Sequence, residues 1–114
     1  MLVTDAMSHV GSDQTILNYC DTQIVRQGDK LTVPDGTLAG SALDMATAVR
    51  NCHQQLGIPL ADALKMATST PAAFLGLSRE IGNISVGCKA NMLLLNDNLE
   101  VQTSWVDGLK KHCV

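Results

Sequence analysis

Asp5 is the first residue whose type and position in the chain suggest chemistry. It follows Leu2, Val3 and Thr4, and a loop containing Ser8 and Gly11 comes after it. This pattern predicts a strand over residues 2–5 with a carboxylate at its carboxyl end, where the ligand-binding loops of parallel α/β proteins converge. A carboxylate at such a place can accept and return a proton. The alternative is an aspartate that caps a turn or solvates the strand end, and these residues alone favour that alternative.

The second candidate segment is DGTLAGSALDM, residues 35–45. Gly36 and Gly40 lack a Cβ, so the backbone there can approach a ligand closely. The segment ends where a helix is predicted to begin, and the free N–H groups of a helix start favour an anion or a polar ligand atom. A plain connection between a loop and a helix accounts for the same residues equally well.

The histidines and cysteines do not form a recognisable metal site or catalytic group. His9, His53 and His112 are far apart in the sequence, whereas metal sites commonly pair histidines at helix or strand spacing. We expect exposed positions for His9, in the loop after Asp5, and for His53, on a predicted helix. The alternative for His9 is that it lines a pocket close to Asp5. Four cysteines at wide and uneven spacings are predicted to be reduced thiols: Cys20, Cys52, Cys88 and Cys113.

Composition narrows the class of protein. The chain has 114 residues, 46% of them apolar and 3% aromatic, and a net charge of −3. Basic residues are scattered, with only Lys110 and Lys111 adjacent, which argues against a nucleic-acid surface and against a polybasic membrane patch. No apolar run approaches the roughly 20 residues that span a bilayer, and no signal segment is recognisable. We therefore expect a cytoplasmic protein with no membrane partner.

The first part of the chain is predicted to contain loops and short strands, over residues 12–37. TQIVRQGDKLTV, residues 22–33, has strand-forming ends around Gln27-Gly28-Asp29, which predicts a hairpin. Pro34-Asp35-Gly36 predicts a second turn.

Helical periodicity begins after this region. Residues 41–57 predict a helix, with Ser41 and Asp44 spaced as a capping box and Gly57 placed to end the helix in the left-handed conformation.

Two more helices are predicted to follow. Pro59 precedes a helix over residues 60–69, and Thr70 is predicted to cap a short helix that starts at Pro71. We expect Phe74 and Leu75 of this short helix to pack against the preceding one.

The last part of the chain has a strand pattern. NMLLLN, residues 91–96, is a continuous apolar run, as expected for a strand covered on both faces. Residues 100–108 alternate in polarity and end in the hairpin signal Asp107-Gly108, so residues 109–114 form either a returning strand or a frayed tail. A single opening strand and two or three closing strands are too few for stable sheets, so both halves look like pieces of a larger structure.

Three stretches together resemble the C-terminal part of the N-acetylglucosamine-6-phosphate deacetylases, a family within the amidohydrolase superfamily. They are LVTDA, GTLAGSALDMATAVRN, and ALKMATSTPAAFLGL taken with IGNISVGCKANMLLL. GTLAGSAL is specific to the deacetylases and disfavours a dihydroorotase-like enzyme. The later stretch is shared more widely among amidohydrolases, so it indicates the superfamily rather than the substrate.

The resemblance implies an α/β fold. The family combines a (β/α)₈ barrel with a small β-sandwich domain, and this chain resembles the C-terminal fragment of that barrel followed by strands of the sandwich. Residues 1–80 would contain the last barrel strand and the helices after it, and residues 81–114 the C-terminal strands of the sandwich. A complete barrel takes about 200 residues or more, so this chain cannot close one.

The resemblance also implies an activity: metal-dependent hydrolysis of N-acetylglucosamine 6-phosphate to glucosamine 6-phosphate and acetate. Asp5 matches the catalytic aspartate, and Leu38, Ala39 and Gly40 match the segment that contacts the sugar phosphate. The family's divalent metal, zinc or iron, takes its ligands from a region that this chain does not contain. We therefore expect the chain alone to be inactive, with the missing N-terminal part or further copies of itself as partners. The alternative is a non-catalytic remnant or assembly module from a truncated or split gene.

Overall fold

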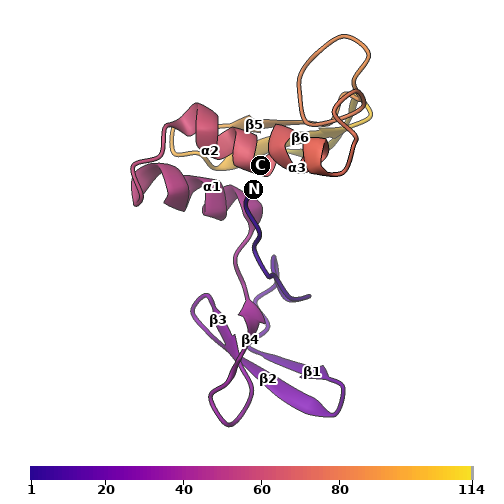
Figure 1. The fold of residues 1–114 in the computed structure, drawn as a ribbon. Helices are drawn as coiled ribbons and strands as arrows, with labels where there is room; N and C mark the ends of the chain where they lie inside the picture. Colours follow the sequence, from indigo (N-terminus) through magenta and orange to yellow (C-terminus); the bar gives the residue numbers. More distant parts are fainter. Residues whose placement is uncertain (114) are drawn as a thin grey trace. The chain divides into compact units, whose positions relative to one another are not determined.

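The computed structural model describes residues 1–113 and has an α/β fold with two antiparallel sheets (Figure 1). The chain divides into two units. We call residues 3–45 the β-meander unit, and residues 1–2 together with 46–114 the helix–sheet unit. Val114, the end of the predicted returning strand, lies outside the described residues.

The β-meander unit is a four-stranded antiparallel sheet whose strands are neighbours in chain order. Its strands are β1 (Ile16–Tyr19), β2 (Thr22–Gln27), β3 (Lys30–Thr32) and β4 (Leu38–Ser41). The hairpin predicted over residues 22–33 is confirmed, since Gln27 pairs with Lys30 across a turn that contains Gly28 at φ +64°. Gly28 adopts this left-handed conformation without the steric cost that a Cβ imposes.

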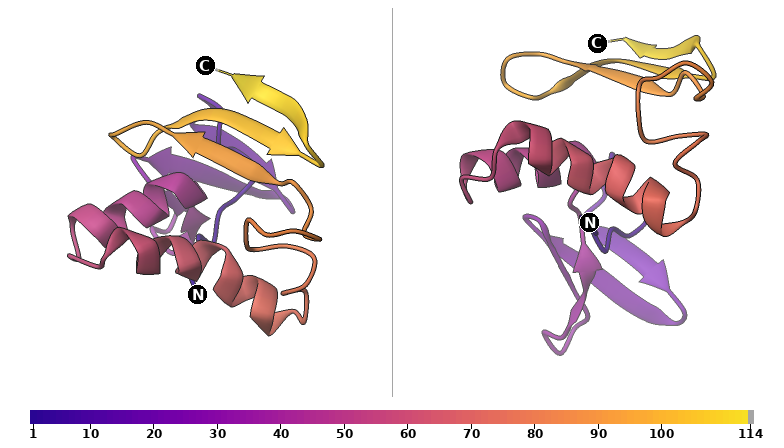
Figure 2. Two further views of the ribbon diagram at one scale, coloured as in Figure 1. Left: turned by 90° about the horizontal axis from the view of Figure 1, so that it is seen from above. Right: turned by 45° about the horizontal axis from the view of Figure 1, so that its top comes forward.

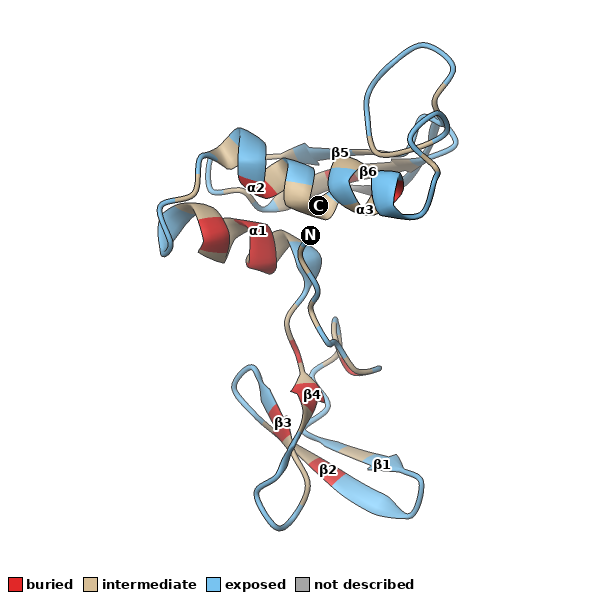
Figure 3. Cartoon of the chain, in the orientation of Figure 1, coloured by how far each residue is buried: buried red, intermediate tan, exposed pale blue. Residues whose placement is uncertain are grey.

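A small apolar cluster holds this sheet together. Ile24 and Leu31 are 3% and 0% exposed, and Ala42 is buried beside them. Four half-buried side chains complete the cluster: Met7, Leu17, Val33 and Ala39. The buried positions of β2 and β3 are visible as the red segments of these strands in Figure 3.

The strand predicted over residues 2–5 does not form. Pairing is limited to an isolated parallel bridge between Ala6 and Ser41, in which the Ser41 N–H donates to the Asp5 carbonyl at 2.9 Å and the Met7 N–H donates to the Ser41 carbonyl at 3.1 Å. A parallel ladder needs neighbours that run alongside for several residues. Here β4 ends at Ser41 and a helix begins at Met45, so the pairing stops after one residue.

The helix–sheet unit begins with the helix α1 (Met45–Gln54), which starts later than the capping box predicts. Ser41 belongs to β4, and its hydroxyl donates to the Thr4 carbonyl and accepts from the Leu43 N–H, so it does not cap the helix. The end of the helix follows the prediction more closely, because Gly57 adopts φ +68° shortly after the last helical turn.

Two short helices follow, α2 (Leu60–Ala67) and α3 (Ser69–Phe74). The start of α2 after Pro59 is confirmed. Thr70 is not a cap, because α3 already begins at Ser69 and Thr68 marks the break between the helices with φ −127° and ψ −88°. The core of this region comprises Val49, Cys52 and Ala63, packed by Leu2, Ile58, Leu60, Leu64 and Ala67.

Phe74 and Leu75 do not pack on the preceding helix. Their exposed fractions are 76% and 64%, whereas Ala72 of the same helix is 3% exposed. Ala72 is therefore the residue through which α3 is buried, and a Cβ built on Gly82 would lie only 2.6 Å from its Cβ. The helix also starts two residues earlier than predicted, at Ser69 rather than at Pro71.

A three-stranded antiparallel sheet completes the unit, in the order β5 (Met92–Leu95), β6 (Val101–Val106) and β7 (Leu109–Cys113). The predicted hairpin at Asp107-Gly108 is confirmed: both residues have positive φ, 50° and 78°, as in a type I′ turn, and β7 is the returning strand. The prediction that β5 is covered on both faces is wrong for this chain, because Leu93 and Leu94 are 60% and 53% exposed.

Within this unit the helices form one layer and the sheet another (Figure 2). The Arg50 guanidinium on α1 donates to the carbonyl of Leu99, in the loop between β5 and β6, at 3.2 Å. The Lys89 N–H donates to the Glu80 carbonyl at 2.7 Å, and this bond joins two parts of the loop between α3 and β5. Among residues 1–113, none of the helices is long and apolar enough to cross a membrane.

The contact between Gly82 and Ala72 gives a stability prediction. Gly82 and Gly87 have nearly equal positive φ, 89° and 94°, but only Gly82 would bring a Cβ into contact with other atoms. We expect Gly82→Ala to lower the free energy of unfolding by about 1–3 kcal/mol more than Gly87→Ala, because overpacking adds to the shared backbone strain. Urea denaturation followed by circular dichroism measures both values, and equal losses would contradict the packing argument.

Candidate functional site

Asp5 lies in the β-meander unit, in a conformation that is unusual for a residue with a side chain. Its φ is +52° and the residue is exposed. Aspartate tolerates the left-handed region better than most residues. The Ser41 N–H binds the Asp5 carbonyl at 2.9 Å, so the backbone of the predicted catalytic residue is fixed on the end of β4 while its carboxylate remains accessible.

The predicted substrate-binding residues lie on β4, directly before Ser41. Leu38 is 65% exposed, Ala39 is half-buried in the apolar cluster, and Gly40 is buried with φ +149°. A Cβ on Gly40 would lie 3.0 Å from the Asp5 carbonyl oxygen and 2.9 Å from Met7 Cγ. Gly40 therefore lies close to Met7 and to the Asp5 backbone, whereas the predicted approach of this segment to a ligand stays a prediction. The structure thus brings together two segments that the sequence keeps apart.

The start of the DGTLAGSALDM segment is a turn, as predicted for residues 34–36. The Gly36 N–H donates to the Val33 carbonyl at 2.9 Å, and the Thr37 N–H donates to Asp35 Oδ1 at 2.9 Å. This backbone hydrogen bond, reinforced by the Thr37 hydroxyl, lowers the pKa of the Asp35 carboxyl below its ordinary value. Asp35 is thus a turn-forming residue that stays ionised, rather than a proton donor.

The expected exposed position of His9 is wrong. Its side chain is 1% exposed, and neither Nδ1 nor Nε2 has a hydrogen-bonding partner among the residues that the structure describes. The Val10 N–H bonds the Met7 carbonyl at 3.2 Å and the Ser12 N–H bonds the His9 carbonyl at 3.1 Å. These two bonds fold the loop back on itself and take the ring out of solvent, which the polarity of the loop does not reveal.

The side chains of His112 and Cys113 lie outside the described part of the chain. His53 is half-buried rather than exposed, with Nδ1 2.9 Å from the Ile58 carbonyl oxygen. Cys20, Cys52 and Cys88 are free thiols, as predicted. Among the side chains that the structure describes, those of residues 1–111, no three His, Cys, Asp or Glu are grouped so that they could hold a metal ion. The described residues therefore do not fit a metal centre of their own.

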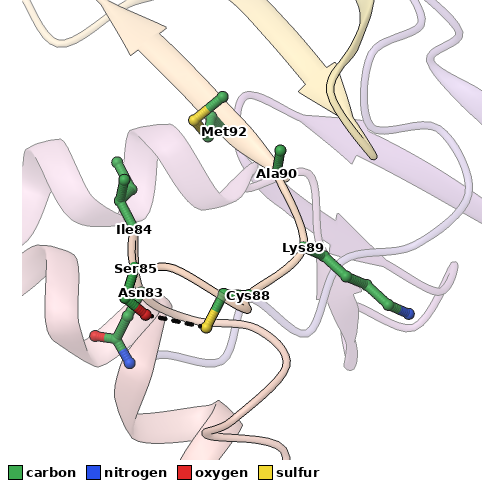
Figure 4. A pocket seen from close by; sticks show the side chains of 7 residues that line it. All are labelled: Asn83, Ile84, Ser85, Cys88, Lys89, Ala90 and Met92. Carbon is green, nitrogen blue, oxygen red and sulfur yellow. Dashed lines mark hydrogen bonds between the residues drawn. The ribbon is translucent and has the colours of Figure 1, made fainter.

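A small hollow lies in the loop before β5, with a volume of about 100 Å³ (Figure 4). Its polar groups include the Cys88 thiol, which lies 3.2 Å from the Ser85 hydroxyl and donates to the Arg79 carbonyl at 3.7 Å. Its lining residues are Asn83, Ile84, Ser85, Cys88, Lys89, Ala90 and Met92. This set contains neither a carboxylate nor an imidazole, and its one ionisable side chain besides the thiol is Lys89.

The family of the chain follows from comparison with known proteins. The model of the amidohydrolase family matches residues 2–111, nearly the whole length. The chain belongs to the amidohydrolase family.

Individual relatives are deacetylases of amino-sugar phosphates. The chain is 45% identical over 108 residues to an N-acetylgalactosamine-6-phosphate deacetylase of Shewanella sp. (strain ANA-3), covering 95% of this chain and 27% of the relative. It is 34% identical to the N-acetylglucosamine-6-phosphate deacetylase of Vibrio furnissii, covering 94% of this chain and 27% of the relative. The chain thus spans only about a quarter of these relatives.

A solved structure has the same arrangement of the backbone. The crystal structure of N-acetylglucosamine-6-phosphate deacetylase from Pasteurella multocida superposes with a TM-score of 0.91 and 32% sequence identity. The match covers 96% of this amidohydrolase chain and 29% of the solved one. The fold described here is therefore found within a larger protein of the same family.

The close approach of Gly40 to Asp5 can be tested with a matched pair of variants. We expect Gly40→Ala to weaken the hydrogen bond from the Ser41 N–H to the Asp5 carbonyl, because the added Cβ would push Asp5 and Met7 away. Gly36→Ala, also at positive φ but with no atom within 4 Å of the added Cβ, is the control. Hydrogen exchange of the Ser41 amide should accelerate in Gly40→Ala alone. Equal protection in both variants would show that Gly40 is not needed for the contact.

Proposed function

We propose that this chain supplies the C-terminal part of an N-acetylglucosamine-6-phosphate deacetylase, which hydrolyses N-acetylglucosamine 6-phosphate to glucosamine 6-phosphate and acetate. The observation that carries the proposal is the juxtaposition of Asp5 with Leu38–Gly40, two segments assigned separately to catalysis and to substrate binding. The bond from the Ser41 N–H to the Asp5 carbonyl joins them. The names of the relatives support the class of substrate.

Asp5 is proposed to transfer a proton during the hydrolysis. Its exposed carboxylate accepts a proton from the attacking water as the water oxygen bonds to the acetamide carbonyl carbon. The same proton is then passed to the nitrogen as the C–N bond breaks, so that acetate and the free amine leave. A carboxylate suits both steps because it holds the proton only briefly. Leu38, Ala39 and Gly40 are proposed to contact the sugar phosphate from the neighbouring strand.

Amidohydrolases are generally metal-dependent, and we propose that the divalent metal, zinc or iron, is held by residues outside this chain. The relatives and the solved structure extend far beyond the region that this chain matches. We derive no step through the metal from the residues described here. The missing ligands also lead us to propose that the chain needs the rest of the enzyme as a partner.

We further propose how the fold relates to the whole enzyme. Residues 1–80 would contribute the last strand of a (β/α)₈ barrel and the helices that follow, and residues 81–114 the C-terminal strands of a small β-sandwich domain. In the complete barrel, parallel neighbours would extend the pairing that is limited here to Ala6 and Ser41.

N-acetylgalactosamine 6-phosphate is the second candidate substrate. The Shewanella relative, at 45% identity, is named for it, whereas the Vibrio and Pasteurella proteins named for the glucosamine derivative are 34% and 32% identical. The two sugars differ only in the orientation of one hydroxyl group. Assaying both compounds side by side decides between them.

A non-catalytic remnant or assembly module from a truncated or split gene is the alternative to a working enzyme part. The two hypotheses, an enzyme part and a non-catalytic remnant, predict different coding content in the neighbouring DNA. A segment upstream of the Met1 codon that encodes the family's Glu and His metal ligands, in any frame, would indicate a split or frameshifted gene.

The purified chain is expected to release no acetate by itself. The reason is that Asp5 alone can move a proton but cannot activate the water or hold the amide for attack. The measurement is acetate release from either sugar phosphate with zinc or iron added. Turnover that Asp5→Asn abolishes would contradict the expectation and show that the chain contains a complete site.

Activity is expected when the missing part is supplied. The chain would be co-produced with the portion of the Shewanella deacetylase that it does not match, and the mixture assayed for acetate. We expect Asp5→Asn to lower kcat by roughly 100- to 10,000-fold, as for loss of a general base, and Asp13→Asn, at another exposed aspartate of the same unit, to leave it unchanged. Equal activity of the Asp5→Asn and unmodified mixtures would overturn the proposed role.

A further inference from the structure

We propose that Ser41 is a positioning residue for the hydrolysis, and that its hydroxyl holds the backbone that carries the Asp5 carboxylate. The proposal rests on the proposed function, because it concerns how the general base is presented to the substrate. Ser41 directly follows Leu38–Gly40, the segment proposed to contact the sugar phosphate, and has no role in that assignment. The hydrogen bonds that Ser41 makes to the Asp5 region assign one to it.

Ser41 binds both peptide groups that flank the Cα atom of Asp5. Its hydroxyl donates to the Thr4 carbonyl, which belongs to the peptide group before Asp5. Its N–H donates at 2.9 Å to the Asp5 carbonyl, which belongs to the peptide group after Asp5. Because peptide groups are planar, the orientations of these two groups define φ and ψ of Asp5. One residue thus fixes the direction in which the Asp5 side chain leaves the backbone.

Asp5 needs this support because its backbone conformation is unfavourable for a residue with a side chain. Its φ is +52°, and the residue is exposed, so packing of the side chain does not hold it in place. Such conformations persist where the surrounding structure over-determines them. The two bonds from Ser41, one on each side of Asp5, supply that constraint.

The bond from the Ser41 hydroxyl to Thr4 differs from the local bonds that serines ordinarily form. Ser41 Oγ also accepts from the Leu43 N–H at 3.1 Å, which is a common local arrangement for serine. Ser12 has the same local bond, from the Gln14 N–H at 3.0 Å. The bond to Thr4, by contrast, is part-buried and joins residues 37 positions apart. A local turn therefore accounts for one hydroxyl bond of Ser41 and not for the other.

The proposed substrate-binding segment has support that does not depend on this hydroxyl. Its strand, β4, pairs with β3 through backbone hydrogen bonds, with Gly40 opposite Leu31. This pairing remains when the Ser41 side chain is shortened. Loss of the hydroxyl should therefore release the backbone at Asp5 while Leu38–Gly40 keep their place. Proton transfer should be impaired more than binding of the substrate.

The first experiment uses the 114-residue chain and needs no activity. Ser41→Ala removes the hydroxyl, Ser41→Thr keeps one, and Ser12→Ala is the matched control that loses only a local bond. We expect the ¹⁵N order parameter of Asp5 to fall in Ser41→Ala from about 0.85, typical of rigid backbone, to below roughly 0.6. The other two variants should match the unmodified chain. A rigid Asp5 in Ser41→Ala, or an equal fall in Ser12→Ala, would overturn the proposal.

The second experiment measures acetate release by a chimera, a single polypeptide in which this chain replaces the matched segment of the Shewanella deacetylase. We expect Ser41→Ala to lower kcat roughly 10- to 100-fold with little change in KM, as for a small misplacement of a catalytic group. Ser41→Thr should recover most of the rate, and Ser12→Ala should leave it unchanged. A loss that appears mainly in KM, or that Ser41→Thr does not recover, would contradict the positioning role.

A double-mutant cycle in the chimera tests whether Ser41 acts through Asp5. Adding Ser41→Ala to Asp5→Asn should lower kcat no further, because the group that the hydroxyl positions is already lost. An equal effect of Ser41→Ala in both backgrounds would show that Ser41 acts independently of Asp5 and would overturn the proposal.

Failure of this proposal is distinguishable from failure of the proposed function. A chimera that releases no Asp5-dependent acetate refutes the proposed function, whereas the order parameter of Asp5 still decides whether the Ser41 hydroxyl holds it. Acetate release that depends on Asp5 but not on the Ser41 hydroxyl leaves the proposed function intact and refutes the positioning role.

Discussion

The pairing between the Asp5 region and Ser41 is the constraint on which the candidate site depends. Two backbone hydrogen bonds form it, from the Ser41 N–H to the Asp5 carbonyl and from the Met7 N–H to the Ser41 carbonyl. Gly40 makes the approach possible because a Cβ there would collide with Met7 and press on the Asp5 carbonyl. The conformation of the acid is therefore set through its backbone, which leaves the carboxylate free for chemistry.

Local signals in the sequence predict the parts of the fold that local chemistry determines. The hairpins at Gly28 and at Asp107-Gly108 form because these residues tolerate positive φ, and the helix after Pro59 forms where the fixed φ of proline favours its start. The candidate site segments were proposed in the same way, from a carboxylate after an apolar run and from two glycines before a helix. What the sequence did not predict is that Gly40 lies against Met7 and the Asp5 carbonyl.

The predictions that are wrong concern residues whose structure depends on contacts with distant parts of the chain. The predicted strand over residues 2–5 lacks parallel neighbours beyond Ser41, so its apolar and β-branched residues remain unpaired. His9 is buried because its loop folds back, which the polarity of neighbouring residues cannot indicate. Phe74 and Leu93 are exposed although their sequence patterns predict burial. Within the described residues, no layer covers these two side chains.

The exposure of apolar residues that were predicted to be buried bears on the stability of β5. Exposing leucines to water on both faces of β5 is unfavourable. This edge strand has 4 residues and no charge, so little prevents it from pairing with other strands. Such a segment is stable only where further polypeptide covers it. The same reasoning applies to the candidate site, in which an accessible carboxylate is positioned on a glycine-containing strand without metal ligands among the described residues. The exposed leucines and the carboxylate without metal ligands are the two features that the proposed function explains together.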